Sequence, residues 1–466
     1  MNNKPRSLAQ TVVTRPLPFT LDFIALSEAD PQRYPFFLES TATAPGTGRY
    51  DILFGFPQHA IVPRRGDDMM FLAELDRLWG QEAGSGCFDG PGPFRGGWFL
   101  YLGYELAEQI EPVLRLPADP SSRLPLAAAY RVPVALVRDH RRRESFAMAE
   151  PEFAMLLDTV ERDVAAIQRG NRPACAPVPR LVDLQEPAPG IFLEAVHRVQ
   201  RYIAAGDIFQ ANISRPWVAR FDREDGALAV YRRLRQTNPA PFAGYAFIGG
   251  EWVISSSPER LVRRRANRIE TRPIAGTRPR EADPWQDRRR RRNLLANIKE
   301  RAEHVMLIDL ARNDLGRICM PGTIRVSELM TVESYAHVHH IVSNVAGDCR
   351  SGITPGEVIA AVFPGGTITG CPKVRCMEII AELECLGRGA YTGALGYLNH
   401  DGDLDLNILI RTFTIRGGQA HFRAGAGIVA DSRAEWELRE TRQKARGLIR
   451  ALEDTGSPLC PGSAGE

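Results

Sequence analysis

Long hydrophobic runs are missing from this sequence. No window approaches the roughly 18 consecutive apolar residues of a membrane-spanning helix, and the opening residues, MNNKPRSLAQTVVTRPLPF, contain no apolar core of secretory type. We therefore expect a cytoplasmic protein with no membrane partner. The 466 residues, 44% of them hydrophobic and 25% charged, predict a globular chain with a large core.

An excess of charge of one sign is also missing. The 59 lysine and arginine residues nearly balance the 56 aspartate and glutamate residues, which leaves a net charge of +3. One basic run, Arg288–Arg292, stands out, but Asp283, Asp287, Glu300 and Glu303 flank it and no aromatic residues interleave with it. We interpret the run as a solvated helix face and expect no nucleic-acid partner.

Lysine is scarce, because arginine supplies nearly all of the basic residues. Codon bias in a GC-rich genome explains the scarcity. The four lysines are Lys4, Lys299, Lys373 and Lys444. Each of them is informative, since a compact ammonium group differs chemically from a guanidinium group.

Several short motifs of known chemistry are absent. The eight cysteines show no C-x-x-C spacing and no paired spacing with histidines, so we expect reduced thiols and neither a disulfide framework nor a thiolate metal site. The chain also lacks the GxxxxGK[ST] and GxGxxG phosphate-binding patterns, which leaves nucleotide binding unsupported.

A proline-rich stretch between residues 173 and 189 predicts a surface connector. We therefore divide the chain into an amino-terminal region (residues 1–185), a catalytic region (residues 190–453) and a tail (residues 454–466). Short apolar runs such as Tyr50–Phe56 and Gly96–Leu106 predict strands, and Phe192–Ala205 predicts a helix.

Two segments with helical spacing carry paired carboxylates. Glu300 and Glu303 share a face of a predicted helix over Asn293–Arg312. Glu437, Glu440 and Lys444 share a face of a second predicted helix over residues 431–453. Together the two pairs could hold Mg²⁺, which prefers oxygen ligands. Taken alone, however, this pattern more often marks a solvated helix surface.

Glycine-rich turns surround these helices. Glycine lets backbone N–H groups approach a bound anion closely, and Arg411, in the strand-like segment ILIRTFTI, could pair with a carboxylate. These parts describe a site for a small, multiply negative organic acid held by backbone amides, Arg411, Lys444 and a metal. The turns are PIAGTRPR (273–280), FPGGTITGCPKVRCMEII (363–380), YTGALGYL (391–398) and FRAGAGIVADS (422–432).

The order of these motifs resembles that of the chorismate-utilising enzymes over residues 192–453. That family includes anthranilate synthase component I, aminodeoxychorismate synthase component I, and the isochorismate and salicylate synthases. The resemblance implies an α+β (mixed α/β) fold in which antiparallel sheets pack together with helices outside. Further matching segments are GDIFQANISRPW, SSSPERL, ERAEHVMLIDLARNDLGR, HHIVSNVAG, DLNILIRTF and GAGIVADS.

The resemblance also implies how Mg²⁺ and chorismate bind. Glu303 and Glu440 would be the metal ligands, supported by Glu300 and Glu437, and the ion would tether the ring carboxylate of chorismate. The remaining substrate-binding positions by this resemblance are Tyr391, Arg411 and the Gly427 backbone for the enolpyruvyl carboxylate, Lys444 nearby, and Gly276 and Thr277 along the ring.

Three further positions resemble the catalytic residues of the family. Glu259 would be the general acid that protonates the departing C4 hydroxyl, and His340 would lie beside the reacting ring, although a hydrogen-bonded core histidine is the alternative. At Gln210, family members that add water resemble one another in having a lysine base, whereas those that use ammonia have glutamine. Gln210 therefore favours an ammonia-using enzyme.

Two ammonia-using activities remain. The GGTITG turn, the segment GRYDILFGFP and the segment GGWFLYLGYEL favour aminodeoxychorismate synthase component I, which is the function we expect. Ala275 favours anthranilate synthase component I, because many aminodeoxychorismate synthases have a lysine there. Phe36–Ser40 (FFLES) also resembles the tryptophan-binding LLES segment of anthranilate synthases.

A GxCxGxQ nucleophile turn of glutamine amidotransferases is absent. The resemblance therefore implies that ammonia comes from solution or from a separate glutamine amidotransferase subunit. The product, 4-amino-4-deoxychorismate, would pass to another enzyme on the way to 4-aminobenzoate and folate. A regulatory binding module of the same fold is the non-enzymatic alternative. It predicts damage at the metal or acid positions, but Glu259, Glu303, Glu440, Arg411 and Lys444 are intact.

Overall fold

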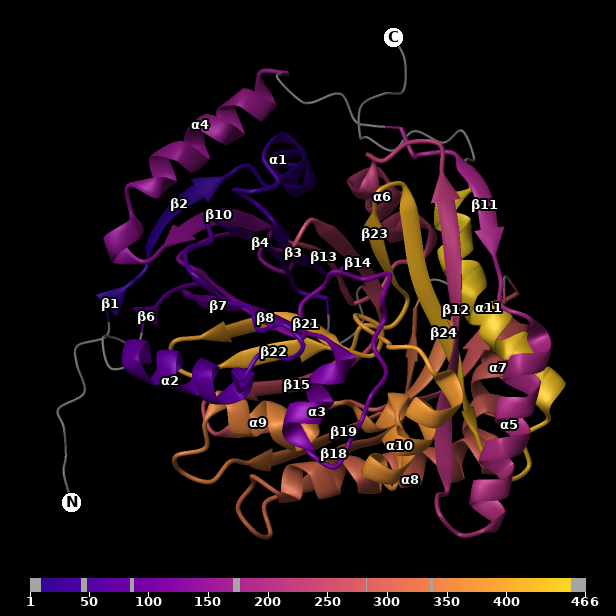
Figure 1. Ribbon diagram of the computed structural model, residues 1–466. Coiled ribbons are helices and arrows are strands. Elements are labelled where there is room, and N and C mark those ends of the chain that lie inside the picture. Colours follow the sequence, from indigo (N-terminus) through magenta and orange to yellow (C-terminus); the bar gives the residue numbers. More distant parts are fainter. Residues whose placement is uncertain are drawn as a thin grey trace.

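A computed structural model describes residues 10–42, 48–83, 88–170, 177–281, 283–335 and 338–453. Within these ranges the chain forms a twelve-stranded sheet, a ten-stranded sheet and a short parallel pair of β1 (Gln10–Thr11) with β6 (Phe88–Asp89). Neighbouring strands in both large sheets are antiparallel, and helices cover their outer faces (Figure 1). This is the α+β architecture expected from the sequence. The predicted tail, residues 454–466, lies outside the described ranges.

The first sheet runs from β11 to β2, with β20 (Gly370–Cys371) beside β12. Its strands in spatial order are β11 (Leu181–Gln185), β12 (Gln210–Phe221), β24 (Gln419–Ile428), β23 (Thr412–Arg416), β14 (Glu251–Ser257), β13 (Phe242–Ile248), β3 (Phe36–Glu39), β4 (Tyr50–Gly55), β9 (Val134–Asp139), β10 (Glu144–Ala149) and β2 (Val13–Leu17).

The second sheet runs from β17 to β5, with β18 (Arg325–Ser334) beside β19. Its strands in spatial order are β17 (Ile274–Pro279), β19 (Val338–Asp348), β16 (Arg268–Thr271), β15 (Arg260–Arg265), β22 (Leu404–Asn407), β21 (Ala394–Asn399), β7 (Gly97–Leu102), β8 (Ala127–Val132) and β5 (Ala60–Ile61).

Each large sheet combines strands from before and after the predicted boundary at residues 185–190. In the first sheet β3 pairs with β13, and in the second β7 pairs with β21. The inner faces of the sheets meet in a shared core, where the rings of Phe36 and Phe99 stack with their centroids 4.2 Å apart. The two regions therefore share one hydrophobic core, and the cleft between the sheets is built by both.

Helices α1, α4, α6 and α11 pack on the outer face of the first sheet, and α2, α8 and α9 pack on that of the second (Figure 1). No helix of the described ranges is long and apolar enough to span a bilayer. The helices are α1 (Phe23–Ala29), α2 (Phe71–Ala83), α3 (Ala107–Ile110), α4 (Leu156–Gln168), α5 (Pro189–Ala204), α6 (Ala227–Thr237), α7 (Pro284–Ala296), α8 (Ile298–Gly316), α9 (Pro355–Val362), α10 (Lys373–Glu384) and α11 (Ala434–Leu452).

The carboxylate-bearing segments are helical, with one correction. The helix expected over Asn293–Arg312 is interrupted at Asn297, whose side chain accepts a hydrogen bond from the backbone N–H of Glu300 and so caps the start of α8. Glu300 therefore lies in the first turn of a new helix. The arginine run Arg288–Arg292 lies on α7 with all five side chains exposed, as a solvated helix face should.

A buried ion-pair network joins α10 to the first sheet. The Glu384 carboxylate accepts hydrogen bonds from Arg388 and Arg423, each at 2.6 Å, and from the backbone and hydroxyl of Ser214. Burial alone would raise the pKa of Glu384, but the two arginine charges hold it below its usual value. The network fixes β12 and β24 relative to α10.

Replacing the carboxylate tests this network. In Glu384→Gln two buried guanidinium groups lose their counter-charge, so we expect the free energy of unfolding to fall by about 3–5 kcal/mol. Denaturant unfolding followed by circular dichroism measures the change. Glu74→Gln is the control, because Glu74 pairs with Arg77 on the surface of α2, and it should leave the unfolding midpoint unchanged. Equal midpoints for both variants would contradict the proposed role.

Candidate active site

The glycine-rich end of β24 forms the floor of the candidate site. Gly427 pairs with Asn212 on β12. A Cβ atom at Gly427 would lie 2.3 Å from Nε2 of Gln210 and 3.5 Å from Oε1 of Glu303. A larger residue at position 427 would therefore displace the Gln210 amide from its present position.

Gln210 and Glu303 meet directly above this floor. The Gln210 amide donates a hydrogen bond from Nε2 to Oε1 of Glu303 at 3.0 Å. Gln210 is buried, and its Oε1 atom accepts no hydrogen bond within the described part of the chain. A buried acceptor without a partner is costly, so Oε1 is suited to accept a hydrogen bond from a small N–H donor.

Glu303 lies in the field of other carboxylates. Burial raises the pKa of Glu303, the Gln210 hydrogen bond and the Lys444 charge lower it, and the negative charges of Glu300 and Glu440 raise it further. Glu440 pairs with Lys444 at 2.8 Å, and Glu300 pairs with Arg278 at 3.0 Å. Glu437, one turn before Glu440 on α11, is buried. The fold thus brings the carboxylates of α8 and α11 close enough for their charges to interact.

This donor set fits a hard divalent cation in its chemistry. Carboxylate oxygens are the ligands that Mg²⁺ prefers, and a cation would relieve the repulsion that raises the Glu303 pKa. However, nowhere in the described ranges do three or more histidine, cysteine, aspartate or glutamate side chains form a ready-made metal cluster. In this structure Oε1 of Glu303 accepts the Gln210 hydrogen bond and Oε1 of Glu440 pairs with Lys444.

Two cations lie beside the carboxylates. Lys444 donates from Nζ to the Gly425 carbonyl at 2.9 Å, and although burial alone would lower the pKa of Lys444, the Glu440 charge raises it above its usual value. Arg411 has a left-handed backbone, with φ of 52°. Burial lowers the pKa of Arg411, which the Glu259 charge only partly offsets.

The Arg411 guanidinium has no hydrogen bond or ion pair with another side chain of the described residues. Its backbone, in contrast, is fixed, because its carbonyl accepts a hydrogen bond from Ser256. Arg411 is half-buried, and the Glu259 charge only partly offsets the cost of withdrawing a guanidinium from water, which an anionic ligand would reduce further. Arg411 is therefore suited to bind an anion.

Tyr391 lies beside Gly425 of β24. Its side chain is buried, and a Cβ atom at Gly425 would lie 3.0 Å from its hydroxyl oxygen. Because Lys444 contacts the same glycine through its carbonyl, the Tyr391 hydroxyl and the Lys444 ammonium approach one short segment of β24. Burial raises the pKa of Tyr391, so its hydroxyl stays protonated and can donate a hydrogen bond.

Glu259 and His340 carry opposite kinds of pKa shift. Glu259, between β14 and β15, is buried, and burial raises its pKa to about 7 against the charges of Lys444 and Arg411. His340, on β19, is also buried, and burial with the Arg411 charge lowers its pKa to about 3. Glu259 can therefore hold a proton near neutral pH, whereas His340 stays neutral.

The turn expected along the substrate ring lies beside these residues. Thr277 pairs with His340 across β17 and β19; the side chain of Thr277 lies outside the described set. Gly276 has a positive φ of 64°, and a Cβ atom there would lie 2.6 Å from Oε2 of Glu300. Arg278, in the same turn, was not singled out from the sequence, although its pairing with Glu300 holds that carboxylate.

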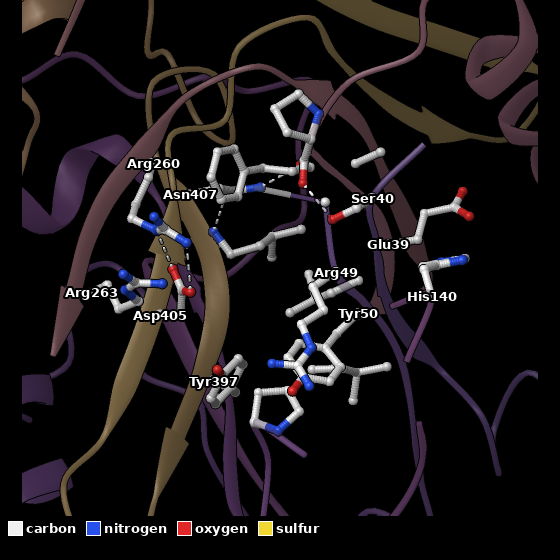
Figure 2. Close-up of a pocket in the computed structure, with 18 of the residues that line it drawn as sticks. Glu39, Ser40, Arg49, Tyr50, His140, Arg260, Arg263, Tyr397, Asp405 and Asn407 are labelled. Carbon is white, nitrogen blue, oxygen red and sulfur yellow. Dashed lines mark hydrogen bonds and ion pairs between the residues drawn. The ribbon is translucent and has the colours of Figure 1, made fainter. Parts of the chain in front are cut away.

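A separate cavity of about 620 Å³ lies between the sheets (Figure 2). It is lined by Glu39 and Ser40 of the FFLES segment from one sheet and by Arg260, Tyr397 and Asn407 from the other. None of the site residues expected from the sequence lines it. The segment that resembles a tryptophan-binding motif therefore borders a cavity away from the candidate active site.

Comparison with known proteins identifies the family. The chorismate binding enzyme model matches residues 55–450. The chain belongs to the chorismate-binding enzyme family. This family assignment makes it an enzyme that acts on chorismate.

Relatives with two different activities are similar to this family member. Anthranilate synthase component 1 of Streptomyces coelicolor is 40% identical over 91% of this chain and 84% of its own length. Aminodeoxychorismate synthase component 1 of Bacillus subtilis is 48% identical, over 56% of this chain and 55% of its own. The crystal structure of anthranilate synthase component I from Streptococcus pneumoniae TIGR4 aligns with a TM-score of 0.76 and 30% identity, covering 87% of this chain and 93% of that one.

The unpaired guanidinium gives a test that separates binding from stability. In Arg411→Met a half-buried charge with no hydrogen-bonded side-chain partner in the described ranges is replaced by an apolar side chain, so we expect the thermal midpoint to stay the same or rise. Affinity for chorismate should fall by about 30-fold or more, since losing a charged contact shielded from water costs roughly 2–5 kcal/mol. Calorimetric titration with chorismate measures the affinity.

Arg423→Met is the matched control, because Arg423 is a buried arginine that already has a carboxylate partner in Glu384. It should lower the thermal midpoint. A large loss of stability in Arg411→Met, with chorismate affinity retained, would contradict the role assigned to Arg411.

Proposed function

We propose that the chain is aminodeoxychorismate synthase component I, a transferase that converts chorismate and ammonia to 4-amino-4-deoxychorismate. Another enzyme would convert this product to 4-aminobenzoate for folate synthesis. The observation that carries the use of ammonia is Gln210, a neutral amide whose buried Oε1 is open to an N–H donor. Such an amide cannot deprotonate water, but it can orient ammonia, which needs no base.

In this proposal the protein's own residues have separate roles in binding chorismate and in donating a proton to it. Arg411 and Tyr391 bind the enolpyruvyl carboxylate, with Lys444 adding positive charge. Glu259, protonated near neutral pH, delivers its proton to the C4 hydroxyl so that water rather than hydroxide leaves. Mg²⁺ bound by Glu303 and Glu440, with Glu300 and Glu437 in support, would neutralise the ring carboxylate.

Ammonia is supplied in this proposal by a separate glutamine amidotransferase subunit. The partial identity with the aminodeoxychorismate synthase of Bacillus subtilis supports the choice of product, as do the GGTITG turn and the segment GRYDILFGFP. Position 275 is a buried alanine, so an amine nucleophile from this position is not part of the mechanism.

Anthranilate synthase component I is the second candidate. Ala275 favours it, and so does the cavity beside the FFLES segment, where that activity would have its tryptophan site. The relative from Streptomyces coelicolor covers more of the chain than the one from Bacillus subtilis does. The two candidates share the site and differ in the product released.

The product decides between the candidates. The purified chain is incubated with chorismate, Mg²⁺ and ammonium at alkaline pH, with and without an aminodeoxychorismate lyase. We expect 4-aminobenzoate only when the lyase is present. Fluorescent anthranilate formed without the lyase would overturn the proposal in favour of the second candidate.

The protonation of Glu259 predicts a pH dependence. Because its pKa is raised to about 7, the acid form is lost as pH rises through that value, and kcat/KM for chorismate should fall on the alkaline side. Turnover is measured with the concentration of free ammonia held constant, so that titration of the nucleophile does not contribute. Glu259→Gln should remove turnover. A rate independent of pH between 6 and 8 would contradict the assignment.

The carboxylates predict a dependence on metal. Glu303→Gln removes a negative charge and an oxygen ligand, so we expect the Mg²⁺ concentration at half-maximal activity to rise at least about tenfold, or turnover to disappear. Thermal unfolding should show an intact fold. Glu435→Gln is the control, since Glu435 is an exposed residue of α11. An unchanged Mg²⁺ dependence in Glu303→Gln would remove this carboxylate from the metal site.

A further inference from the structure

Two buried cysteines face each other at the far ends of the elements that carry the site. Cys319 follows α8, which holds Glu300 and Glu303, and Cys349 directly follows β19, which holds His340. The two cysteines form an isolated antiparallel bridge. Both are 3% exposed, and both are free thiols.

The backbone hydrogen bonds around the bridge define its geometry. Met320 donates to the Asp348 carbonyl at 2.8 Å, and Arg350 donates to the Ile318 carbonyl at 3.0 Å. These two bonds enclose the cysteines, so Cys319 and Cys349 form a non-hydrogen-bonded pair. Cα atoms of such pairs lie about 4.5 Å apart, within the range of about 4.4–6.8 Å that a disulfide spans. The backbone is therefore already placed for a cross-link.

The side chains are also in contact. A hydrogen bond from the Cys319 thiol lowers the pKa of Cys349, and although burial opposes this effect, the Arg264 charge strengthens it. The charge of Asp348 acts in the opposite direction. Gly347 leaves room for the Cys319 thiol, because a Cβ atom at position 347 would lie 2.8 Å from Sγ of Cys319. Cys349 is thus the thiol more readily converted to the nucleophilic thiolate.

The pair lies just below the protein surface. Met320 and Arg350, which follow the two cysteines in the chain, are exposed, Met320 at 42%. A reagent from solution would therefore reach the pair through local opening of this bridge. Cys385 provides a contrast, because it is exposed but its thiol donates to the carbonyl of Glu382.

We propose that Cys319 and Cys349 are a modification site that a low-molecular-weight disulfide, such as oxidised glutathione, converts to an intramolecular disulfide. The Cys349 thiolate attacks one sulfur of the reagent, forms a mixed disulfide and releases one glutathione. The Cys319 thiol then attacks the Cys349 sulfur and releases the second glutathione. The protein loses two electrons and two protons, which the two released thiols carry.

The cross-link fixes the end of α8 to the end of β19. It closes a loop that contains β18 and β19, which restricts the unfolded chain and stabilises the folded state. Because the two backbones already pair in the reduced protein, the native structure needs little adjustment. This inference does not depend on the proposed function, since it concerns only the thiol pair and the reagent.

The test uses the full chain treated with oxidised glutathione, blocked with iodoacetamide and digested without reduction. We expect mass spectrometry to find a peptide that links Cys319 to Cys349. The thermal midpoint should rise by a few degrees and return to its original value with dithiothreitol. Cys385→Ala should behave like the unmodified sequence in both measurements.

Cys319→Ala and Cys349→Ala should each lose the linked peptide and the rise in midpoint, and their midpoints under reducing conditions report whether they fold. Recovery of both cysteines as alkylated thiols after treatment would overturn the proposal. So would a glutathione adduct on Cys349 that never resolves to the cross-link, or a rise in midpoint that persists in Cys349→Ala.

Discussion

The arrangement of charge around Arg411 and Glu303 is the constraint on which the candidate site depends. Glu303 is half-buried near Glu300 and Glu440, and the Arg411 guanidinium has no hydrogen bond or ion pair with the described side chains. Such an arrangement lowers stability in an empty protein. In the proposed function, a ligand that brings negative charge to Arg411 and a cation to Glu303 would offset this cost.

The pairing of β12 with β24 places these charges. Gly425 and Gly427 leave room above the strand, where the Tyr391 hydroxyl, the Gln210 amide and the Glu303 carboxylate lie. A Cβ atom would lie 2.5 Å from Oδ1 of Asn212 at Gly425 and 2.3 Å from Nε2 of Gln210 at Gly427, so a side chain at either glycine would displace a neighbour. The two glycines and the register of β12 against β24 thus determine where these side chains lie at one end of β24.

Part of this structure could be predicted from the sequence. Helical spacing was sufficient for α5 and α11, and the turns at glycine and proline separated many of the strands. It was not sufficient at Asn297, where a side-chain cap starts a new helix. Pairings such as β3 with β13 depend on contacts between distant segments, and periodicity carries no information about them. The same holds for Cys319 and Cys349, whose separation in the sequence resembles no motif.

The candidate site, like the fold, could be predicted only in part from the sequence. Spacing placed Glu300 and Glu303 on one helix face, and family resemblance indicated Arg411, Lys444 and Glu259. Neither could indicate that Gln210 would hold Glu303 or that Arg278 would hold Glu300, because both contacts depend on tertiary packing. For the same reason, the sequence could not indicate that the described ranges contain no group of three or more metal-ligating side chains.

A crystal structure of the protein with Mg²⁺ and chorismate tests the central claim most directly. The account predicts a carboxylate of chorismate on the Arg411 guanidinium and a metal ion bound by Glu303 and Glu440. Chorismate bound elsewhere, with Arg411 still without an anion, would contradict it.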